Sequence, residues 1–492
     1  MKHTNYIAVD LGATSGRVVL SAFDGTKVEM REVARFRNPM IPMNGHLFWN
    51  LPALYYEILQ GLRKVAAEKV EITSIGIDTW GCDFAFFTAD GQLSGLPHCY
   101  RDRHTEGAME KFFASVSPEH LYELTGIQFM NFNSLFQLDT LRRNGCAALE
   151  TADKILFMPD ALSYLLTGNA VTEYTVASTS QMLNPRTGEL EPELLEAIGL
   201  PRERFGRMVR PGTVVGRLTP QVSEYTGLPD VPVVAVAGHD TASAVAAVPA
   251  SGTNFAYLSC GTWSLLGIET LTPVITEDSF RKNFTNEGGL DGTTRFLKNI
   301  CGMWLFERCR EEFPDTQCKD VPVLAALCET SDYEGVIDPD APCFAAPVSM
   351  MRAIEDYCRR TGQEVPRVPA DYIRCIYRSL ALRYRQVIGW LREMSPFPIE
   401  CLHVIGGGSR NAYLMQYAAD ATGLPVVSGP VEGTALGNTL VQVRASGGVG
   451  TLADMRRISA ASVELKRYTP CPSPAWEKAY ARFLEVQQKE NN

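Results

Sequence analysis

Two segments of the chain, about 250 residues apart, have the same order of features, and this repetition constrains the fold most strongly. Residues 6–9 and 255–259 are short apolar runs, and each is followed by a turn with glycine and hydroxyl side chains and then by a second apolar run. This pattern predicts a strand, a tight turn and a strand in both places. Because a single hydrophobic core rarely grows beyond about 250–300 residues, we expect two domains in this 492-residue chain, residues 1–246 and 247–492.

The composition predicts a soluble globular protein. Hydrophobic residues make up 45% of the chain and charged residues 21%, and the net charge of −10 argues against general binding to nucleic acid or to an anionic membrane. The longest apolar stretch, residues 231–238, is much shorter than the ~18–20 residues that span a bilayer, and the first ten residues have no secretion-signal pattern. We therefore expect a cytoplasmic protein whose thirteen cysteines are mostly buried thiols.

Helical and strand-like periodicities alternate along the chain. Residues 51–68 and 372–394 place apolar side chains three to four positions apart, on one helical face. Residues 72–78 and 402–405 are short apolar runs typical of buried strands, and the second leads directly into three glycines. This alternation predicts an α/β fold.

Three strand-to-turn junctions offer backbone N–H groups to an anion. The first is Asp10 with the small-residue turn after it, residues 11–16, where a strand-end aspartate can also hold Mg²⁺ through water. The second is residues 259–263, and the third is residues 406–411. A plain β-hairpin explains the first two turns equally well or better, whereas the consecutive glycines of the third favour a ligand.

A fourth candidate site follows the most strongly β-branched run of the chain, residues 231–237. His239, Asp240 and Thr241 come directly after it, where an α/β fold forms its ligand crevice. An aspartate there can accept the proton of a hydroxyl group that attacks phosphorus. The same aspartate is also a good N-cap for the helix that follows, and the two roles are compatible.

Two well-known phosphate-transfer motifs are absent from the sequence. No Gly-Lys dipeptide occurs, which excludes a Walker P-loop, and neither H-R-D nor D-F-G of the protein kinases is present. A nucleotide must therefore be bound by the glycine-containing turns described above.

Several long motifs are similar to those of the FGGY family of carbohydrate kinases, and the resemblance runs nearly from end to end. The most specific are residues 77–84 (IDTWGCDF), 238–245 (GHDTASAV) and 285–289 (TNEGG), supported by 297–302 (LKNICG) and 432–438 (EGTALGN). The resemblance implies two ribonuclease H-like domains of the actin-like ATPase superfamily, with the active site in the cleft between them. It also implies phosphoryl transfer from MgATP to a hydroxyl group of a sugar.

The resemblance gives individual residues expected roles. Asp240 is the expected catalytic base, and Asp10 is expected near the Mg²⁺ ion. In the nucleotide site, Thr262 belongs to the second phosphate loop, Gly407 to the platform under the adenosine, and Glu307 is a further contact. The expected first phosphate loop comprises Ala13, Thr14, Ser15, Gly16 and Arg17. The expected sugar pocket comprises Gly81, His239, Asp240, Thr241 and Asn299.

The resemblance is closest around the expected sugar pocket to kinases of L-rhamnulose, and it implies phosphorylation of this sugar at O1 and hence a step of L-rhamnose degradation. A related kinase that acts on L-fuculose or another ketose is the nearer alternative, and a non-enzymatic actin-like ATPase switch is the more distant one. The expected partners are the sugar and ATP, without nucleic acid or membrane. We expect a monomer or a small homo-oligomer.

Overall fold

The computed structural model describes residues 3–314 and 319–490, and the chain divides into two compact units. Unit 1 consists of Met1–Ala247, Glu269–Phe296 and Gly433–Ser462. Unit 2 consists of Val248–Ile268, Leu297–Glu432 and Val463–Asn492. Each compact unit is therefore assembled from separate parts of the chain. The division into residues 1–246 and 247–492 describes contiguous sequence domains and stays a prediction.

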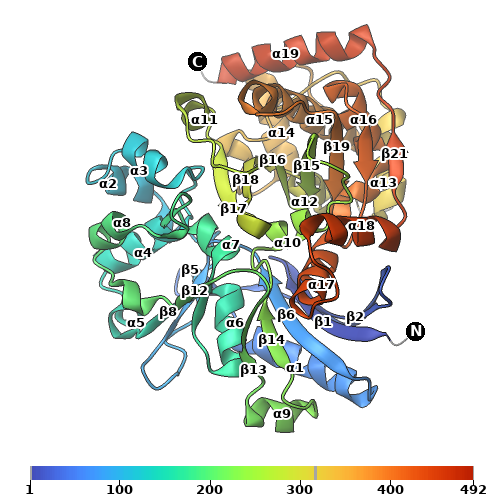
Figure 1. Ribbon diagram of the computed structural model, residues 1–492. Coiled ribbons are helices and arrows are strands. Elements are labelled where there is room, and N and C mark those ends of the chain that lie inside the picture. Colours follow the sequence, from blue (N-terminus) through green and yellow to red (C-terminus); the bar gives the residue numbers. More distant parts are fainter. Residues whose placement is uncertain (1–2, 315–318, 491–492) are drawn as a thin grey trace. The chain divides into compact units, whose positions relative to one another are not determined.

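The centre of unit 1 is a six-stranded sheet with the strand order β13-β14-β6-β1-β2-β3 (Figure 1). Its strands are β1 (Thr4–Leu11), β2 (Ser15–Phe23), β3 (Val28–Arg37), β6 (Ile72–Thr79), β13 (Thr213–Arg217) and β14 (Pro232–Ala235). Strands β1, β2 and β3 are consecutive and antiparallel, whereas β6 pairs in parallel with both β1 and β14. Parallel neighbours end at the same edge of a sheet, so the residues that follow β1, β6 and β14 share one edge.

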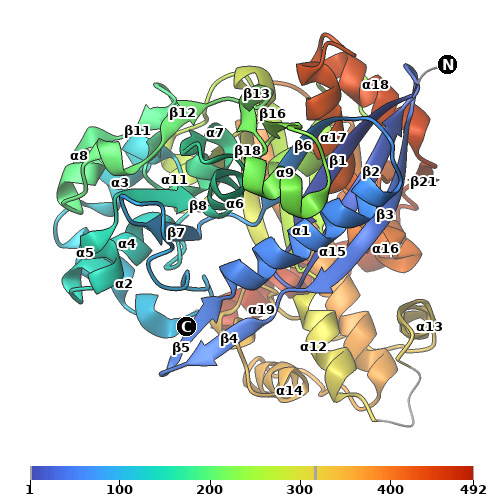
Figure 2. The same cartoon turned by 90° about the horizontal axis from the view of Figure 1, so that it is seen from below.

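Helices cover both faces of this sheet. Ile7 and Val9 of β1 belong to the same core cluster as the apolar face of α1 (Leu51–Ala67), and Figure 2 shows α1 lying along β2 and β3. Ala8, between them, packs with Ala435 of α17 (Gly433–Ala445). This alternation is the period-two pattern of a strand that is buried on both faces.

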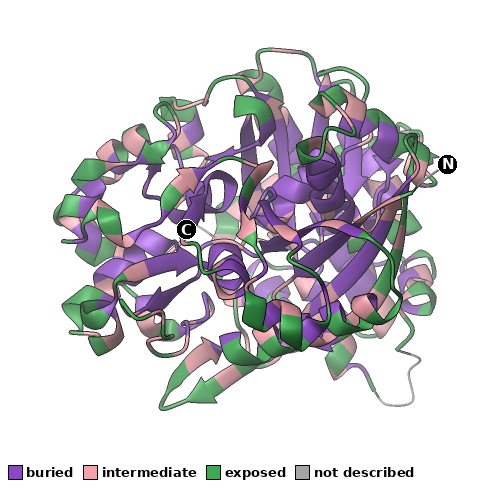
Figure 3. Cartoon of the chain, turned by 60° about the horizontal axis from the view of Figure 1, so that its bottom comes forward, coloured by how far each residue is buried: buried purple, intermediate pink, exposed green. Residues whose placement is uncertain are grey.

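The remainder of unit 1 is mainly helical and packs around an aromatic core. It contains the antiparallel pair β7 (Phe84–Phe87) and β8 (Lys154–Phe157), and its core includes Phe112 and Phe136. Its longer helices are α3 (Pro118–Thr125), α4 (Ser134–Arg143) and α6 (Met158–Thr167). The hairpin of β4 (Met40–Met43) and β5 (His46–Trp49) leads into α1. In Figure 3 most strands are buried, whereas many helices have one exposed face.

The second large sheet has the strand order β17-β18-β16-β15-β19-β20-β21. Its strands are β15 (Phe255–Cys260), β16 (Trp263–Thr270), β17 (Thr285–Gly288), β18 (Thr294–Cys301), β19 (Cys401–Ile405), β20 (Val426–Ser428) and β21 (Lys466–Tyr468). In unit 2, α15 (Pro369–Met394) packs on α16 (Ala412–Thr422). Strand β15 pairs antiparallel with β16 and parallel with β19, just as β1 pairs with β2 and β6 in unit 1. The two predicted strand–turn–strand segments are therefore both present.

Within the described residues, no helix combines the length and the apolar character needed to cross a membrane. The twelve cysteines in this part of the chain are free thiols, and seven of them are buried. The thirteenth, Cys318, lies outside the described residues.

Candidate functional site

The first predicted phosphate loop is the turn of the β1–β2 hairpin. The turn spans only residues 12–14, because residues 15–17, which the sequence analysis placed in the loop, already belong to β2. Gly12 donates its N–H to the carbonyl oxygen of Ser15 at 2.9 Å. Gly16 is required by packing, since a Cβ there would lie 2.4 Å from side-chain atoms of Leu11 and Phe36. The backbone here is a β-hairpin, and the contact of residues 13–17 with phosphate stays a prediction.

Asp10 lies between the guanidinium of Arg17 on β2 and the aspartate Asp78 on β6. Arg17, its direct partner across the hairpin, donates to Oδ2 of Asp10 from Nε at 2.9 Å and from Nη2 at 2.5 Å. On the other side, the parallel register between β1 and β6 pairs Asp10 with Asp78. Two neighbouring strands thus each carry an aspartate at the same level, near their C-terminal ends.

Asp78 is fully buried, and burial raises its pKa well above the usual value, with the charges of Asp10 and Asp240 raising it further. Asn438 of α17 donates a hydrogen bond to its Oδ2 at 2.6 Å, while Oδ1 finds no hydrogen-bond partner within the described part of the chain. A buried carboxylate oxygen without a partner is costly, and it is also the type of ligand that a hard divalent cation binds. The sequence analysis gave Asp78 no role, although an aspartate at the end of an apolar strand was a visible signal.

His239, Asp240 and Thr241 lie where the chain leaves β14 and enters α10 (Asp240–Ala246). The N-cap of this helix is His239, so the prediction that Asp240 is the N-cap was wrong by one position. Oδ1 of Asp240 accepts a hydrogen bond from the Thr241 N–H at 2.5 Å and lies 3.4 Å from Nε2 of His239. Burial raises the pKa of Asp240, whereas His239 and the bonds from Thr241 act in the opposite direction. A carboxylate with a raised pKa is a suitable proton acceptor.

A buried ion pair holds the other side of the His239 ring. Nη1 of the fully buried Arg295 lies 3.0 Å from Oε2 of Glu287, and Nη2 of Arg295 lies 3.2 Å from Nδ1 of His239. Burial alone would raise the pKa of Glu287, but the charge of Arg295 holds it below its usual value. Sequence analysis missed both roles, although Glu287 belongs to the TNEGG motif. The pair fixes the ring so that Nε2 faces Asp240.

Gly81 is explained by its neighbour Thr179. A Cβ at this position would lie 2.8 Å from Oγ1 of Thr179, the same oxygen that accepts a hydrogen bond from the Cys82 N–H at 3.1 Å. Trp80 is buried, and its Nε1 donates to Asp83 at 2.9 Å. Packing is therefore sufficient to account for both residues, and the contact of Gly81 with a sugar stays a prediction.

In unit 2 the second predicted loop and the glycine turn lie against each other. A Cβ on Gly408 would lie 2.3 Å from Sγ of Cys260, and Gly406, with φ 87°, approaches the carbonyl oxygen of Cys260. A Cβ on Gly407, in contrast, would meet nothing within 4 Å. Burial raises the pKa of the Cys260 thiol to about 11, so this side chain is neutral at physiological pH. The glycine turn thus has one packed side and one open side.

The other predicted residues of unit 2 lie around the β15–β16 hairpin. The carbonyl oxygen of Thr262, in its turn, accepts hydrogen bonds at 3.2 Å from the N–H groups of Gly302 and Trp304, which anchors the start of α12 (Trp304–Glu312) at the loop. Glu307 lies on α12 and forms an ion pair with Arg310. Asn299 lies on β18 in unit 2, whereas the other predicted sugar-pocket residues belong to unit 1. Their joint action stays a prediction.

Two family models match the chain. The N-terminal domain of the FGGY family of carbohydrate kinases matches residues 5–247, and the C-terminal domain of that family matches residues 256–446. The chain belongs to the FGGY family of carbohydrate kinases. The family prediction is thus confirmed, and with it kinase chemistry on a sugar and ATP, which generally requires a divalent cation.

Individual FGGY kinases are similar over almost their whole length. The rhamnulokinase of Bacteroides thetaiotaomicron is 56% identical over 479 residues, which cover 97% of this chain and 98% of that protein. The rhamnulokinase of Pectobacterium atrosepticum is 42% identical over 492 residues, covering 99% and 97%. The crystal structure of gluconate kinase from Lactobacillus acidophilus matches with a TM-score of 0.82 at 15% identity, covering 99% of this chain and 98% of that one. This match confirms the two-domain α/β fold.

Proposed function

We propose that this FGGY kinase phosphorylates L-rhamnulose at O1 with ATP, giving L-rhamnulose 1-phosphate and ADP. The similarity to rhamnulokinases along nearly the full chain carries this proposal, because it includes the motifs that hold His239 and Asp240 as well as the folding core. The structural likeness to gluconate kinase supports only the fold. The expected setting is L-rhamnose degradation in the cytoplasm.

Asp240 is the proposed general base. It would take the proton of the O1 hydroxyl as that oxygen attacks the γ-phosphorus of ATP. Three features of unit 1 support this role: its position at the start of α10, its raised pKa, and the neighbouring His239 ring, which the Glu287–Arg295 pair holds in place. His239, Thr241 and Gly81, together with Asn299 of unit 2, are the proposed sugar contacts.

Mg²⁺ is the proposed divalent cation, and Asp10 and Asp78 are the residues that would hold it. The buried Oδ1 of Asp78, which has no hydrogen-bond partner among the described residues, fits such an ion. Three interacting carboxylates, Asp10, Asp78 and Asp240, face one nearby cation, Arg17, and this excess of negative charge also fits. When bound, Mg²⁺ supplies charge neutralisation for the phosphate oxygens of ATP. The neighbouring residues 13–17 would form the first phosphate loop.

The nucleotide is proposed to bind to Thr262, Glu307 and Gly407 of unit 2. The open side of Gly407 supports this assignment, since a flat base can lie against a glycine that no neighbouring atom covers. The metal residues and most of the proposed sugar contacts belong to unit 1, whereas Asn299 and the nucleotide residues belong to unit 2. The acidic net charge argues against general binding to nucleic acid or to an anionic membrane. A monomer or small homo-oligomer is proposed.

A coupled ADP-release assay across a panel of ketoses tests the function. L-Rhamnulose should give the highest kcat/KM, with L-fuculose and L-xylulose lower by about tenfold or more, since a wrong epimer leaves buried polar groups unpaired. A better rate with L-fuculose would identify a related kinase instead. ATP consumption that does not depend on any sugar would favour the non-enzymatic ATPase switch.

A further inference from the structure

Three histidines gather around one carboxylate oxygen in unit 1. The chain has only seven histidines, and His46, His98 and His104 all face Asp102. Nδ1 of His46 lies 3.0 Å from Oδ1 of Asp102, Nδ1 of His98 lies 3.6 Å from it, and Nδ1 of His104 lies 2.8 Å from it. The kinase chemistry described above uses none of these four residues.

The backbone holds this group in place through β5 and an isolated β-bridge to it. His46 begins β5, directly after the turn of Asn44 and Gly45. His98, which lies outside the named strands, forms an isolated β-bridge with Phe48 of β5. Cys99 donates its N–H to the carbonyl oxygen of Leu47 at 2.9 Å, which fixes the two segments against each other. The spacing of the two imidazoles therefore does not depend on flexible side chains alone.

The Asp102 carboxylate is oriented before any ligand arrives. Its Oδ2 accepts the Leu47 N–H at 2.5 Å, and its Oδ1 accepts the His104 N–H at 2.9 Å as the cap of a short 3₁₀ helix. The carboxylate is thus held in a fixed orientation, as the carboxylates of metal sites commonly are.

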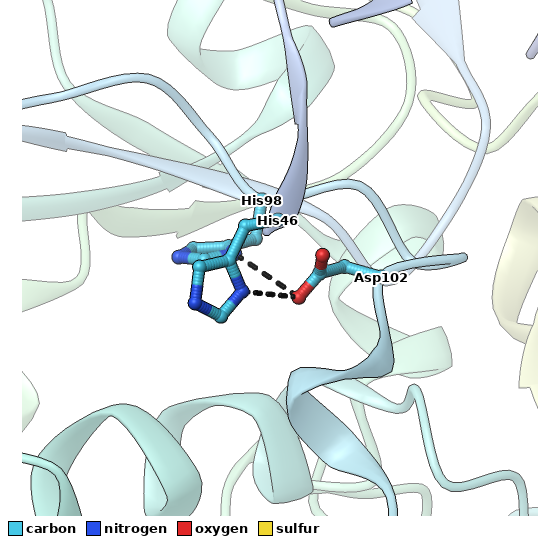
Figure 4. Close-up of side chains that lie close together, drawn as sticks. All are labelled: His46, His98 and Asp102. Atoms are coloured by element: carbon cyan, nitrogen blue, oxygen red, sulfur yellow. Dashed lines mark hydrogen bonds and ion pairs between the residues drawn. The ribbon is translucent and has the colours of Figure 1, made fainter. Parts of the chain in front are cut away.

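One potential ligand atom from each of His46, His98 and Asp102 lies close enough to the other two to bind the same ion. One ring nitrogen each of His46 and His98 and one oxygen of Asp102 lie within 4.8 Å of one another, and Figure 4 shows both rings facing the carboxylate. Nδ1 of His98 is buried and has no hydrogen-bond partner among the described residues. Ligand atoms around a tetrahedral zinc ion are separated by roughly 3.4 Å, given Zn–N bonds of about 2.0–2.1 Å. The separations of 3.0 and 3.6 Å from Oδ1 bracket this value.

An ion can approach His46 and Asp102 from a cavity that His98 does not line. His46 and Asp102 line a cavity of about 390 Å³ together with Met43, Asn44, Gly45 and Arg103. The guanidinium of Arg103 pairs with Glu106 at 3.1 Å.

We propose that His46, His98 and Asp102 form a binding site for a divalent transition-metal ion, with His104 as a positioning residue for the carboxylate. Two imidazoles and one carboxylate are a ligand set for Zn²⁺, with water in the fourth position. Binding displaces the proton that His46 shares with Oδ1 of Asp102, and His46 then carries its proton on Nε2. The ion joins the β4–β5 hairpin to residues 98–102 and stabilises unit 1.

The test uses the full chain, stripped with a chelator and titrated with Zn²⁺ or Co²⁺ in the presence of excess Mg²⁺, which occupies oxygen-rich sites. Isothermal titration calorimetry should show one ion per chain, the visible spectrum of Co²⁺ should report nitrogen and oxygen ligands, and the melting temperature should rise. His46 is half-exposed, so His46→Ala should keep the fold and weaken the ion at least about tenfold.

His120→Ala is the matched control, because His120 is exposed to nearly the same degree, 44% against 46%, and is paired with Glu193 instead. This variant should bind the ion as the unmodified protein does. Absence of binding by the unmodified protein, or equal affinity in His46→Ala, would overturn the proposal. A His98→Gln variant with a normal circular-dichroism melt should also lose the Co²⁺ spectrum, and retention of that spectrum would count equally against the site.

Discussion

Asn438 donates a hydrogen bond from Nδ2 to Oδ2 of Asp78 over 2.6 Å, although 360 residues separate the two in the sequence. The orientation of the Asn438 amide is set in turn by Gln442, one helical turn later, which donates to Oδ1 of Asn438 at 2.7 Å. α17 thus brings polar side chains to the buried face of the β1–β6 sheet. They satisfy one oxygen of Asp78 and leave the other for a ligand.

Asp78→Asn should separate metal binding from stability. The change removes a carboxylate whose burial is unfavourable, so the free energy of unfolding should stay the same or increase. The Mg²⁺ concentration for half-maximal kinase activity should increase about tenfold or more, because a charged oxygen ligand is lost. Steady-state rates over a Mg²⁺ series, together with denaturant unfolding, measure both effects.

Asp160→Asn is the control for this experiment. Asp160 is another buried carboxyl of unit 1 whose pKa is raised by burial and by Glu173, and it is not one of the groups that act on Asp78. Its Mg²⁺ dependence should match that of the unmodified protein. An unchanged Mg²⁺ requirement in Asp78→Asn would remove Asp78 from the cation site.

Gly437→Ala should destabilise the protein by about 1–3 kcal/mol or more. α10 and α17 pack so closely that a Cβ on Gly437 would lie 1.7 Å from the carbonyl oxygen of Ser243, and backbone atoms must move to make room. Gly389→Ala, within α15, is the matched control, because a Cβ there would meet nothing within 4 Å and alanine favours a helix by roughly 0.5–1 kcal/mol. The melting temperature should therefore decrease in Gly437→Ala and increase in Gly389→Ala. Equal changes in the two variants would contradict the close contact between α10 and α17.

Asp83→Asn should change the pH dependence of stability. Burial raises the pKa of Asp83 to about 6, against hydrogen bonds from Gln137, Trp49 and Trp80. An aspartate in the unfolded chain titrates near 3.9, so between about pH 4 and pH 6 the folded protein binds more protons and loses stability as the pH rises. The variant lacks this loss, so its free energy of unfolding relative to the unmodified protein should increase by roughly 2 kcal/mol from pH 4 to pH 7.

Urea unfolding at several pH values measures this difference. The exposed Asp230→Asn serves as the control, and its difference from the unmodified protein should stay nearly constant over the same range. If the difference for Asp83→Asn were also constant, Asp83 would not titrate near pH 6 in the folded protein.

Local patterns predicted most of the regular structure. The helix expected over residues 51–68 is α1 (Leu51–Ala67), and the one over 372–394 is the greater part of α15 (Pro369–Met394), because both have long apolar faces with three-to-four spacing. The predicted first turn, residues 11–16, was too long. Ser15 and Gly16 pair with residues of β3, and residue types that are common in turns do not reveal such pairing.

The residues that hold the side chains of the candidate site in place could not be predicted from the sequence. Glu287 was visible only as part of the TNEGG motif, and Arg295 had no signal in the sequence. Their contacts with His239 depend on the fold. The Asn438–Asp78 bond likewise depends on the return of residues 433–462 to unit 1. The three histidines around Asp102 are separated by up to 58 positions, which resembles no short metal-binding spacing.

Asp240→Asn should abolish most of the kinase activity while leaving the fold intact. The amide keeps an oxygen that accepts the Thr241 N–H, so the start of α10 and the contact with His239 are retained, but it cannot take a proton. With L-rhamnulose, kcat should fall by roughly 10²–10⁴, the usual contribution of a positioned general base, while the affinity for ADP measured by calorimetry stays unchanged. Asp291→Asn, an exposed partner of Arg444 in the same unit, should keep full activity. An Asp240→Asn protein with nearly normal kcat would remove this residue from the role of base.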